Sequence, residues 1–278
     1  MSSFSVNTNI TSIEAQIQLG YTQMNLQKTI TQLTSGLRIN TAADDAAGLA
    51  VANREQLDDT GLQAGIRSAN DAFSALQAED GAMSNISTLL DRAMTLASQA
   101  ASDTFQGDRN TLNAEFSSVL SEITRTATAV GIGTSGSALN SQQIFIGNTQ
   151  TNTGASVSYI TVNLTSAGAV DASGLSVNTA SIDTQANAAS AISAIQSAVA
   201  ALGKTQGAVG AAMNRLQFAV SQAQTLDVSV QAAHSQIMDA NIAQAAANLS
   251  KYQILQQSGI AALAQANTSP QAILRLLQ

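Results

Sequence analysis

The two ends of the chain, residues 1–43 and 236–278, constrain its fold more than any other feature. Each end carries only three charged residues, and together they contain a single proline. Aliphatic residues recur along both ends at steps of three and four, as in Ile10, Ile13 and Ile17, which is the spacing of one helix face. A helix with an apolar face and almost no charge is poorly suited to stand alone in water. Both ends are therefore predicted to be helices that pack against each other and against further copies of the chain.

The distribution of charge and residue types excludes several classes of partner. The formal net charge is −7 and each end carries +1, so residues 44–235 carry −9 and are expected to face solvent. There is no basic patch, which argues against nucleic acid, and no stretch approaches the roughly 20 apolar residues of a membrane span. The chain has no cysteine, so neither disulfides nor thiolate metal sites can form. We therefore expect no nucleic-acid partner and no membrane partner.

Helical periodicity covers most of the chain. The apolar spacing predicts one long helix from Ile10 to Leu37, with a phase shift of its apolar face near Gly20. Further helices are predicted at 44–63, 68–102, 112–130 and 184–267. A helix of about 60 residues would be roughly 90 Å long, which indicates an elongated molecule.

The segment 131–183 has a different character. It holds seven of the chain's 18 glycines. Residues 143–146 are a short apolar strand candidate, and residues 158–164 alternate between apolar and polar side chains, so a β-hairpin is predicted. The helices on either side must then run antiparallel. The predicted fold class is mainly α, an elongated antiparallel coiled-coil rod built from both chain ends, with a small β-hairpin insertion.

Three patterns resemble known binding or catalytic sites but do not meet the requirements of those sites. Residues 131–136 match G-x-G-x-x-G, yet a helix precedes them and a loop follows, whereas a dinucleotide site needs a strand before the motif and a helix after it. His234 is the only histidine, so a two-histidine zinc site is impossible. The acid pairs 44–45 and 58–59 are adjacent residues, which do not face each other on a helix, and they are interpreted as capping and solvated charges. No catalytic, cofactor or metal site is predicted, and we do not expect an enzyme.

Motifs at both ends closely resemble those of bacterial flagellin. Near the N-terminus they are Leu-Thr-Ser-Gly-Leu-Arg-Ile-Asn at 33–40 and Asp-Asp-Ala-Ala-Gly at 44–48. Near the C-terminus they are Gln-Ile-Leu-Gln-Gln-Ser-Gly at 253–259 and Leu-Ala-Gln-Ala-Asn at 263–267. The resemblance covers roughly residues 1–128 and 190–278. The residues that carry it are Ser35, Gly36, Arg38, Asn40, Asp44, Asp45, Gln253, Gln256, Gln257 and Asn267.

This resemblance implies a structural subunit that polymerises into the bacterial flagellar filament used for swimming. It implies an inner coiled-coil domain (1–43 and 236–278) and a helical rod domain (44–130 and 184–235) that includes the hairpin insertion (131–183). It also implies secretion, unfolded, through the flagellar type III apparatus to the extracellular filament. An N-terminus without the basic and apolar segments of a signal peptide is consistent with such a route. The implied partners are identical subunits, a secretion chaperone on the C-terminal segment, the filament cap and hook-junction proteins.

The apolar residues of the ends are the candidates for the filament core. Intramolecular packing between the two ends would use the same side chains, and some are expected to do both. The candidates are Ile10, Ile13, Leu33, Leu37, Leu249, Tyr252, Leu255 and Leu263.

A further resemblance concerns Arg92, Leu96 and Glu115. They fall where flagellins recognised by the vertebrate Toll-like receptor 5 carry arginine, leucine and glutamate, although Met94 and Thr95 replace the usual Arg-Glu between them. The alternative interpretation makes Leu96 a helix-seam residue and the two charged residues surface or subunit contacts.

The alternative function is a hook-filament junction protein or a surface adhesin exported by the flagellar type III route. Such a protein would share the coiled-coil ends. A junction protein usually carries a larger central domain than 131–183, and the Gln-Ile-Leu-Gln-Gln stretch favours flagellin.

Overall fold

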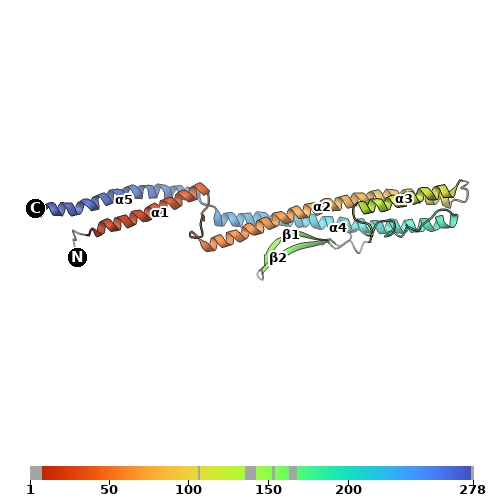
Figure 1. Ribbon diagram of the computed structural model, residues 1–278, viewed down its shortest axis with the longest axis horizontal. Helices are drawn as coiled ribbons and strands as arrows, with labels where there is room; N and C mark the ends of the chain where they lie inside the picture. Colours follow the sequence, from red (N-terminus) through yellow and green to blue (C-terminus); the bar gives the residue numbers. More distant parts are fainter. Residues whose placement is uncertain (1–7, 106, 135–141, 152–153, 163–167, 277–278) are drawn as a thin grey trace. The chain divides into compact units, whose positions relative to one another are not determined.

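The computed structural model describes residues 8–105, 107–134, 142–151, 154–162 and 168–276. In chain order the elements are α1 (Ile10–Ser35), α2 (Ala46–Ala101), α3 (Arg109–Ala129), β1 (Gln142–Thr151), β2 (Gly154–Val162), α4 (Gln185–Met238) and α5 (Ile242–Leu276), as Figure 1 shows. The mainly α-helical fold with one antiparallel hairpin confirms the predicted class.

The chain divides into two compact units. The terminal unit consists of Met1–Leu57 with Val230–Gln278, and the central unit is Asp58–Ser229. These boundaries lie inside α2 and α4, whereas the sequence placed them at 43/44 and 235/236. The difference arises because the turn after α1 packs into the terminal unit, where Ile39, Ala52 and Met238 form a buried cluster.

Two predicted helix boundaries were wrong. The helices expected at 44–63 and 68–102 are one continuous helix, α2, and the helix expected at 184–267 breaks between Met238 and Ile242. At that break the Asn241 side chain accepts a hydrogen bond from the Gln244 amide, 3.1 Å away, which starts α5 with an N-cap. The predicted break near 104–108 is confirmed, because α2 ends at Ala101 and α3 begins at Arg109 with Asp108 as its cap.

In the central unit, α2 and α4 follow a strict seven-residue repeat. They lie side by side (Figure 1) and together line a small cavity at Phe73 and Leu216. Buried side chains at alternating steps of three and four are the pattern of coiled-coil seams. On α2 they are Leu76, Glu79, Met83, Ile86, Leu90, Ala93, Ala97 and Ala100, and on α4 they are Ala188, Ala191, Ile195, Ala198, Leu202, Thr205, Val209, Ala212 and Leu216.

Within the described part of the chain, α4 is the one helix long and apolar enough to cross a membrane by length and composition. Its most apolar 18-residue window has a mean hydropathy of 1.2 and is 28% buried, which departs from the expectation that no stretch approaches a span. A core helix of a soluble protein meets the same criteria. Alanines on both the buried and the exposed sides of α4, such as Ala191 and Ala200, account for this apolar character.

The hairpin packs tightly on α2 through a glycine. β1 and β2 are antiparallel, with a register shift between Phe145 and Gly147, and the side chains of Ile144 and Ile146 are buried. A Cβ atom placed on Gly65 of α2 would lie 2.0 Å from the Ile146 carbonyl oxygen. The helix backbone and the strand backbone are therefore in direct contact. Residues 163 and 164 of the predicted second strand lie outside the described residues.

The loop that begins at Gly131 is held by one carboxylate, Asp171. Burial opposes its ionisation, but hydrogen bonds from the Thr134 hydroxyl and from the Gly174 and Thr134 amides lower its pKa below the usual range. The Val170 amide also donates to the Ile132 carbonyl at 3.1 Å. Residues 131–134 form a turn and loop, as predicted, and residues 135–136 lie outside the described residues.

Two acidic side chains occupy seam positions of α2. Asp58 was interpreted as a solvated charge, but it is 8% exposed, and Glu79 is 6% exposed. One carboxyl oxygen of each (Oδ1 and Oε2) lacks a hydrogen-bond partner among the described residues. Burial raises the pKa of Glu79 to about 7. Since burial disfavours the charged form, the fold prefers this side chain protonated.

Replacing Glu79 is expected to change the pH dependence of stability. A raised native pKa contributes stability that is complete below the unfolded value of 4.5 and is lost as pH rises through about 7. Glu79→Gln should therefore match the wild type at pH 4 and be up to about 3 kcal/mol more stable at pH 8. Urea denaturation of both proteins at pH 4 and at pH 8 measures the difference in their free energies of unfolding. Equal stability differences at pH 4 and pH 8 would contradict the prediction.

Candidate assembly surface

In the terminal unit, α1 and α5 pair along a second seven-residue seam. Apart from Gly20, Gln32 and Asn248, the residues of both helices that are described as not exposed recur at alternating steps of three and four. On α1 they are Ser12, Ala15, Leu19, Thr22, Leu26, Thr29 and Leu33, and on α5 they are Ala245, Leu249, Tyr252, Gln256, Gly259, Leu263 and Ala266. The seam of α1 is continuous through Gly20. The predicted phase shift of the apolar residues is nevertheless seen, because Ile10 and Ile17 are exposed whereas Leu26 lies on the seam.

This seam is built from small and polar side chains. Thr22 and Thr29 are buried, and their hydroxyls donate to the carbonyls of Gln18 and Asn25 in their own helix, at 2.9 and 2.8 Å. Threonine can therefore occupy a seam position without an unpaired hydroxyl. A Cβ on Gly259 would lie 3.2 Å from Leu19 Cδ1, so this glycine permits close helix packing. The seam buries few large side chains.

Five large apolar side chains of α1 lie on the face opposite the seam, whereas Leu19, Leu26 and Leu33 lie on the seam. Ile17 is 53% exposed and Met24 is 65% exposed. Their spacing of three and four places them in one line along the helix. We call this line the outer stripe, and its members are Ile10, Ile13, Ile17, Tyr21 and Met24. The sequence had indicated its first three members, and the same step continues to Tyr21 and Met24.

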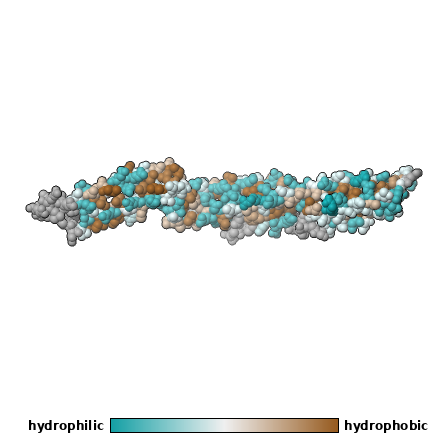
Figure 2. Space-filling view, turned by 45° about the horizontal axis from the view of Figure 1, so that its top comes forward, coloured by the Kyte–Doolittle hydropathy of each residue, from teal (hydrophilic) through white to brown (hydrophobic). Residues whose placement is uncertain are grey.

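Helix α5 also presents large apolar side chains to solvent. Figure 2 shows hydrophobic side chains, in brown, exposed over the terminal helices. On α5 the exposed residues are Ile242, Ile254, Leu255 and Ile260. With the outer stripe of α1, these residues are candidates for contact with another protein chain.

The eight core candidates therefore fall into two groups. Ile10, Ile13 and Leu255 are exposed. The other five are half-buried, four of them on the α1–α5 seam and Leu37 against the Ile39 cluster: Leu33, Leu37, Leu249, Tyr252 and Leu263. The packing within the chain uses the second group and leaves the first group free for other contacts.

Hydrogen bonds fasten the two helices at the chain-terminal end. The Asn9 side chain donates to the Ala266 carbonyl at 2.8 Å, and the Ser12 hydroxyl donates to Asn267 Oδ1 at 2.8 Å. Asn267 is one of the motif residues, and its contact fixes the register of α1 against α5. Of the motif glutamines, Gln256 lies on the seam, and Gln253 and Gln257 are exposed.

The N-terminal motif builds the turn that follows α1. Gly36 ends α1 in the left-handed conformation, with φ of 73°, which glycine adopts at no steric cost. The guanidinium of Arg38 donates to the Ile237 carbonyl at 2.9 and 3.0 Å. Leu37 and Asp239 form an isolated antiparallel bridge. The motif thus joins the α1 turn to the end of α4.

The acid pair of the motif caps this turn. Asp45 accepts from the Gly48 amide at 2.8 Å at the start of α2. The ammonium of Lys28, 2.8 Å from Asp44, and the amides of Asn40 and Thr41 lower the pKa of Asp44 to about 2. Other contacts complete the turn: the Ser35 hydroxyl accepts from the Leu37 amide, and the Asn40 side chain donates to the Leu37 carbonyl.

The three receptor candidates have different environments in the central unit. The guanidinium of Arg92 donates to Glu115 Oε1, 3.1 Å from its Nε, and both side chains are exposed. Leu96 is only 2% exposed, so its side chain belongs to the helix core rather than to the surface. The charged pair is available for contact, and Leu96 supports the helices beneath it.

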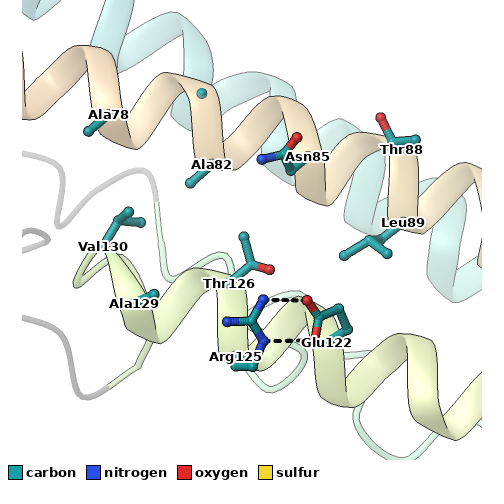
Figure 3. Close-up of a pocket in the computed structure, with 11 residues that line it drawn as sticks. Ala78, Ala82, Asn85, Thr88, Leu89, Glu122, Arg125, Thr126, Ala129 and Val130 are labelled. Atoms are coloured by element: carbon teal, nitrogen blue, oxygen red, sulfur yellow. Dashed lines mark hydrogen bonds and ion pairs between the residues drawn. The ribbon is translucent and has the colours of Figure 1, made fainter.

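A shallow groove of about 580 Å³ runs between α2 and α3 (Figure 3). Ala78 and Ala82 of α2 face Ala129 and Val130 across it. On its α3 side, the guanidinium of Arg125 pairs with Glu122 one helical turn earlier. Among the described residues, no group of three or more His, Asp or Glu side chains could hold a metal ion.

Comparison with known proteins covers both ends and the middle of the chain. Residues 6–135 match the bacterial flagellin N-terminal helical region, and residues 192–277 match the bacterial flagellin C-terminal helical region. The chain is 33% identical over 279 residues to a flagellin of Halalkalibacterium halodurans, covering 98% of this chain and 99% of that one. It is 31% identical over 291 residues to a 33 kDa flagellar filament core protein of Treponema phagedenis, with the same coverage. A crystal structure of Bacillus cereus flagellin is similar, at 24% identity and a TM-score of 0.44, over 56% of this chain and 88% of that chain.

Proposed function

Because this chain belongs to the bacterial flagellin family, we propose that the outer stripe of α1 and the exposed apolar residues of α5 form its polymerisation surfaces. The protein is a structural subunit that self-assembles into a flagellar filament outside the cell. The alternative of a junction protein or adhesin is not favoured, since flagellins match nearly the whole chain.

The outer stripe carries this proposal. Its five large side chains face away from α5 and cannot be buried by the chain's own seam. Burying one large aliphatic side chain contributes about 1.5–3 kcal/mol, whereas association costs about 4–15 kcal/mol in lost freedom of motion. A single residue cannot drive assembly, but several stripe residues per subunit can.

The eight core candidates take two roles in this proposal. Ile10, Ile13 and Leu255 contact neighbouring subunits directly. The half-buried candidates, which include Leu33 and Tyr252, hold α1 and α5 together so that the stripe is presented on a rigid pair. Residues 1–43 and 236–278 then form the inner domain, and residues 44–235 form the rod domain with its hairpin.

Partners other than identical subunits are proposed from family membership. A secretion chaperone would cover the exposed apolar residues of α5 before export through the flagellar type III apparatus. The filament cap and the hook-junction proteins would meet the same terminal helices at the two filament ends. Arg92 and Glu115 are the exposed candidates for contact with Toll-like receptor 5.

Electron microscopy of the purified full-length protein tests the polymerisation surfaces. Negatively stained samples are expected to show long filaments above a critical concentration. A protein that stays monomeric at all concentrations and salt conditions would contradict filament assembly and would favour the junction-protein alternative.

Receptor contact has its own test in a cell line that reports Toll-like receptor 5 signalling. Purified monomer should activate the reporter, and the double variant Arg92→Ala/Glu115→Ala should do so more weakly. No response to the wild-type monomer, while a known agonist gives full signal, would end this part of the proposal.

A further inference from the structure

Met24 differs from every other methionine that the structure describes. It is 65% exposed, whereas Met83 is fully buried and Met238 is 9% exposed. Met94 and Met213 are half-buried. Oxidation of a thioether depends on access of the oxidant to the sulfur, so Met24 is expected to react first in the monomer.

The position of Met24 makes this reactivity consequential. It lies on the outer stripe, one helical turn after Tyr21 and two after Ile17, and both of these side chains are more than half exposed. The inference rests on the proposed function, in which this stripe is covered by a second copy of the chain. Met24 is then open to solvent before assembly and shielded after it.

We propose that Met24 is an oxidation site that controls whether a subunit can enter the filament. A peroxide is the co-reactant. A lone pair of the Met24 sulfur attacks one peroxide oxygen, the O–O bond breaks, and the S–O bond of methionine sulfoxide forms. With hydrogen peroxide, the departing hydroxide takes the proton from the oxygen that is now bonded to sulfur, and it leaves as water. The thioether is oxidised by two electrons and the peroxide is reduced.

The product changes the chemistry of the stripe. A sulfoxide is polar, whereas the thioether is apolar. Burying a polar group without a hydrogen-bond partner is unfavourable, and the neighbouring stripe residues Ile17 and Tyr21 offer at most the Tyr21 hydroxyl. The critical concentration of subunits oxidised at Met24 is expected to rise about tenfold or more. Methionine sulfoxide reductases restore the thioether, so the block is reversible.

The first experiment is peroxide footprinting of the monomer and of the filament. Both are treated with hydrogen peroxide, and peptide mass spectrometry follows each methionine. Met24 should be oxidised fastest in the monomer and at least tenfold more slowly in the filament. Met94 and Met213, which lie in the central unit, serve as partly accessible references, and Met83 serves as the buried control.

The second experiment measures assembly of oxidised subunits. Wild-type monomer treated with peroxide should lose filament formation and regain it after methionine sulfoxide reductase treatment. Met24→Leu keeps an apolar side chain without sulfur, so it should assemble normally with and without peroxide. Met24→Gln places a polar amide there and should assemble poorly without any oxidant.

The outcomes separate this inference from the proposed function. If Met24 is protected in the filament but Met24-oxidised monomer assembles normally, the oxidation control is overturned and the assembly surface stands. If Met24 reacts equally fast in monomer and filament, the stripe is not covered and both proposals fail. If Met24→Leu is as sensitive to peroxide as the wild type, another residue is responsible and the assignment to Met24 is overturned.

Discussion

Ile17→Asp is expected to abolish filament formation at concentrations where the wild type polymerises. Ile17 is in the middle of the outer stripe and is 53% exposed in the single chain. The variant loses about 1.5–3 kcal/mol of burial energy in the filament and must also bury an unpaired carboxylate, which costs several kcal/mol more. A combined loss of at least about 4 kcal/mol raises the critical concentration about a thousandfold. Sedimentation of polymer from a dilution series measures the critical concentration.

The α1–α5 pair itself should survive this change. Ile17 faces away from the seam, so far-ultraviolet circular dichroism and thermal unfolding of the monomer are expected to match the wild type. Gln23→Asp supplies the matched control, because it adds the same charge to an exposed polar site of α1 outside the stripe. Normal filaments from Ile17→Asp, or an equal defect in Gln23→Asp, would rule out the outer stripe as the polymerisation surface.

Gly65→Ala should release the hairpin from α2 and destabilise the central unit by about 3 kcal/mol. The new Cβ would lie 2.0 Å from the Ile146 carbonyl oxygen and 2.1 Å from its carbon. Both are backbone atoms, so the whole strand β1 must move to relieve the clash. Overpacking of this kind typically costs 1–3 kcal/mol and sometimes more. Denaturation curves report the stability, and hydrogen exchange of the β1 and β2 amides reports the release.

Gly81→Ala on the same helix is the control, and it is expected to change the free energy of unfolding in the opposite direction. A Cβ on Gly81 meets no atom within 4 Å. Alanine is favoured over glycine inside a helix by about 0.5–1 kcal/mol, so this variant should be more stable than the wild type. If both variants stabilise the protein alike, the close contact between Gly65 and β1 does not exist in solution.

The features that were predicted correctly depend on patterns among residues close together in the sequence. The helical ends follow from the spacing of Ile10, Ile13 and Ile17, and the β-hairpin follows from the alternation before Val162. Each of these signals depends on a few neighbouring residues, which a single sequence displays in full.

The errors came from polar residues in seams. Hydropathy marks neither Thr22 nor Thr29 as buried, so the continuous seam of α1 was not predicted. Each hydroxyl is satisfied by its own helix, and that pairing depends on structure rather than on residue type. The burial of Asp58 and Glu79 was also missed, because both residues are polar by hydropathy. A carboxylate is usually a surface group, and only the position in the seven-residue repeat indicates that these two are buried.

The break before α5 was missed because its signals are long-range. Asp239 pairs with Leu37 and the Ala240 amide donates to the Gly36 carbonyl, about 200 residues away in sequence. The Asn241 cap is a local signal, but one asparagine within an alanine-rich helical pattern is weak evidence of a stop. The partners that end α4 belong to the other end of the chain.

The fastening of α1 to α5 has a mechanical consequence. The described hydrogen bonds that link the N-terminal segment to the C-terminal segment gather at its two extremes, at Asn9 and Ser12 and at the Gly36–Arg38 turn. Between them the two helices meet through van der Waals contacts of seam residues such as Leu26, Thr29 and Ala245, which have no preferred direction. Among the described residues, directional bonds therefore join α1 and α5 only at the two extremes of the pair. The hydrogen bonds at the two extremes hold the register of the pair, and bending of its middle would break none of them.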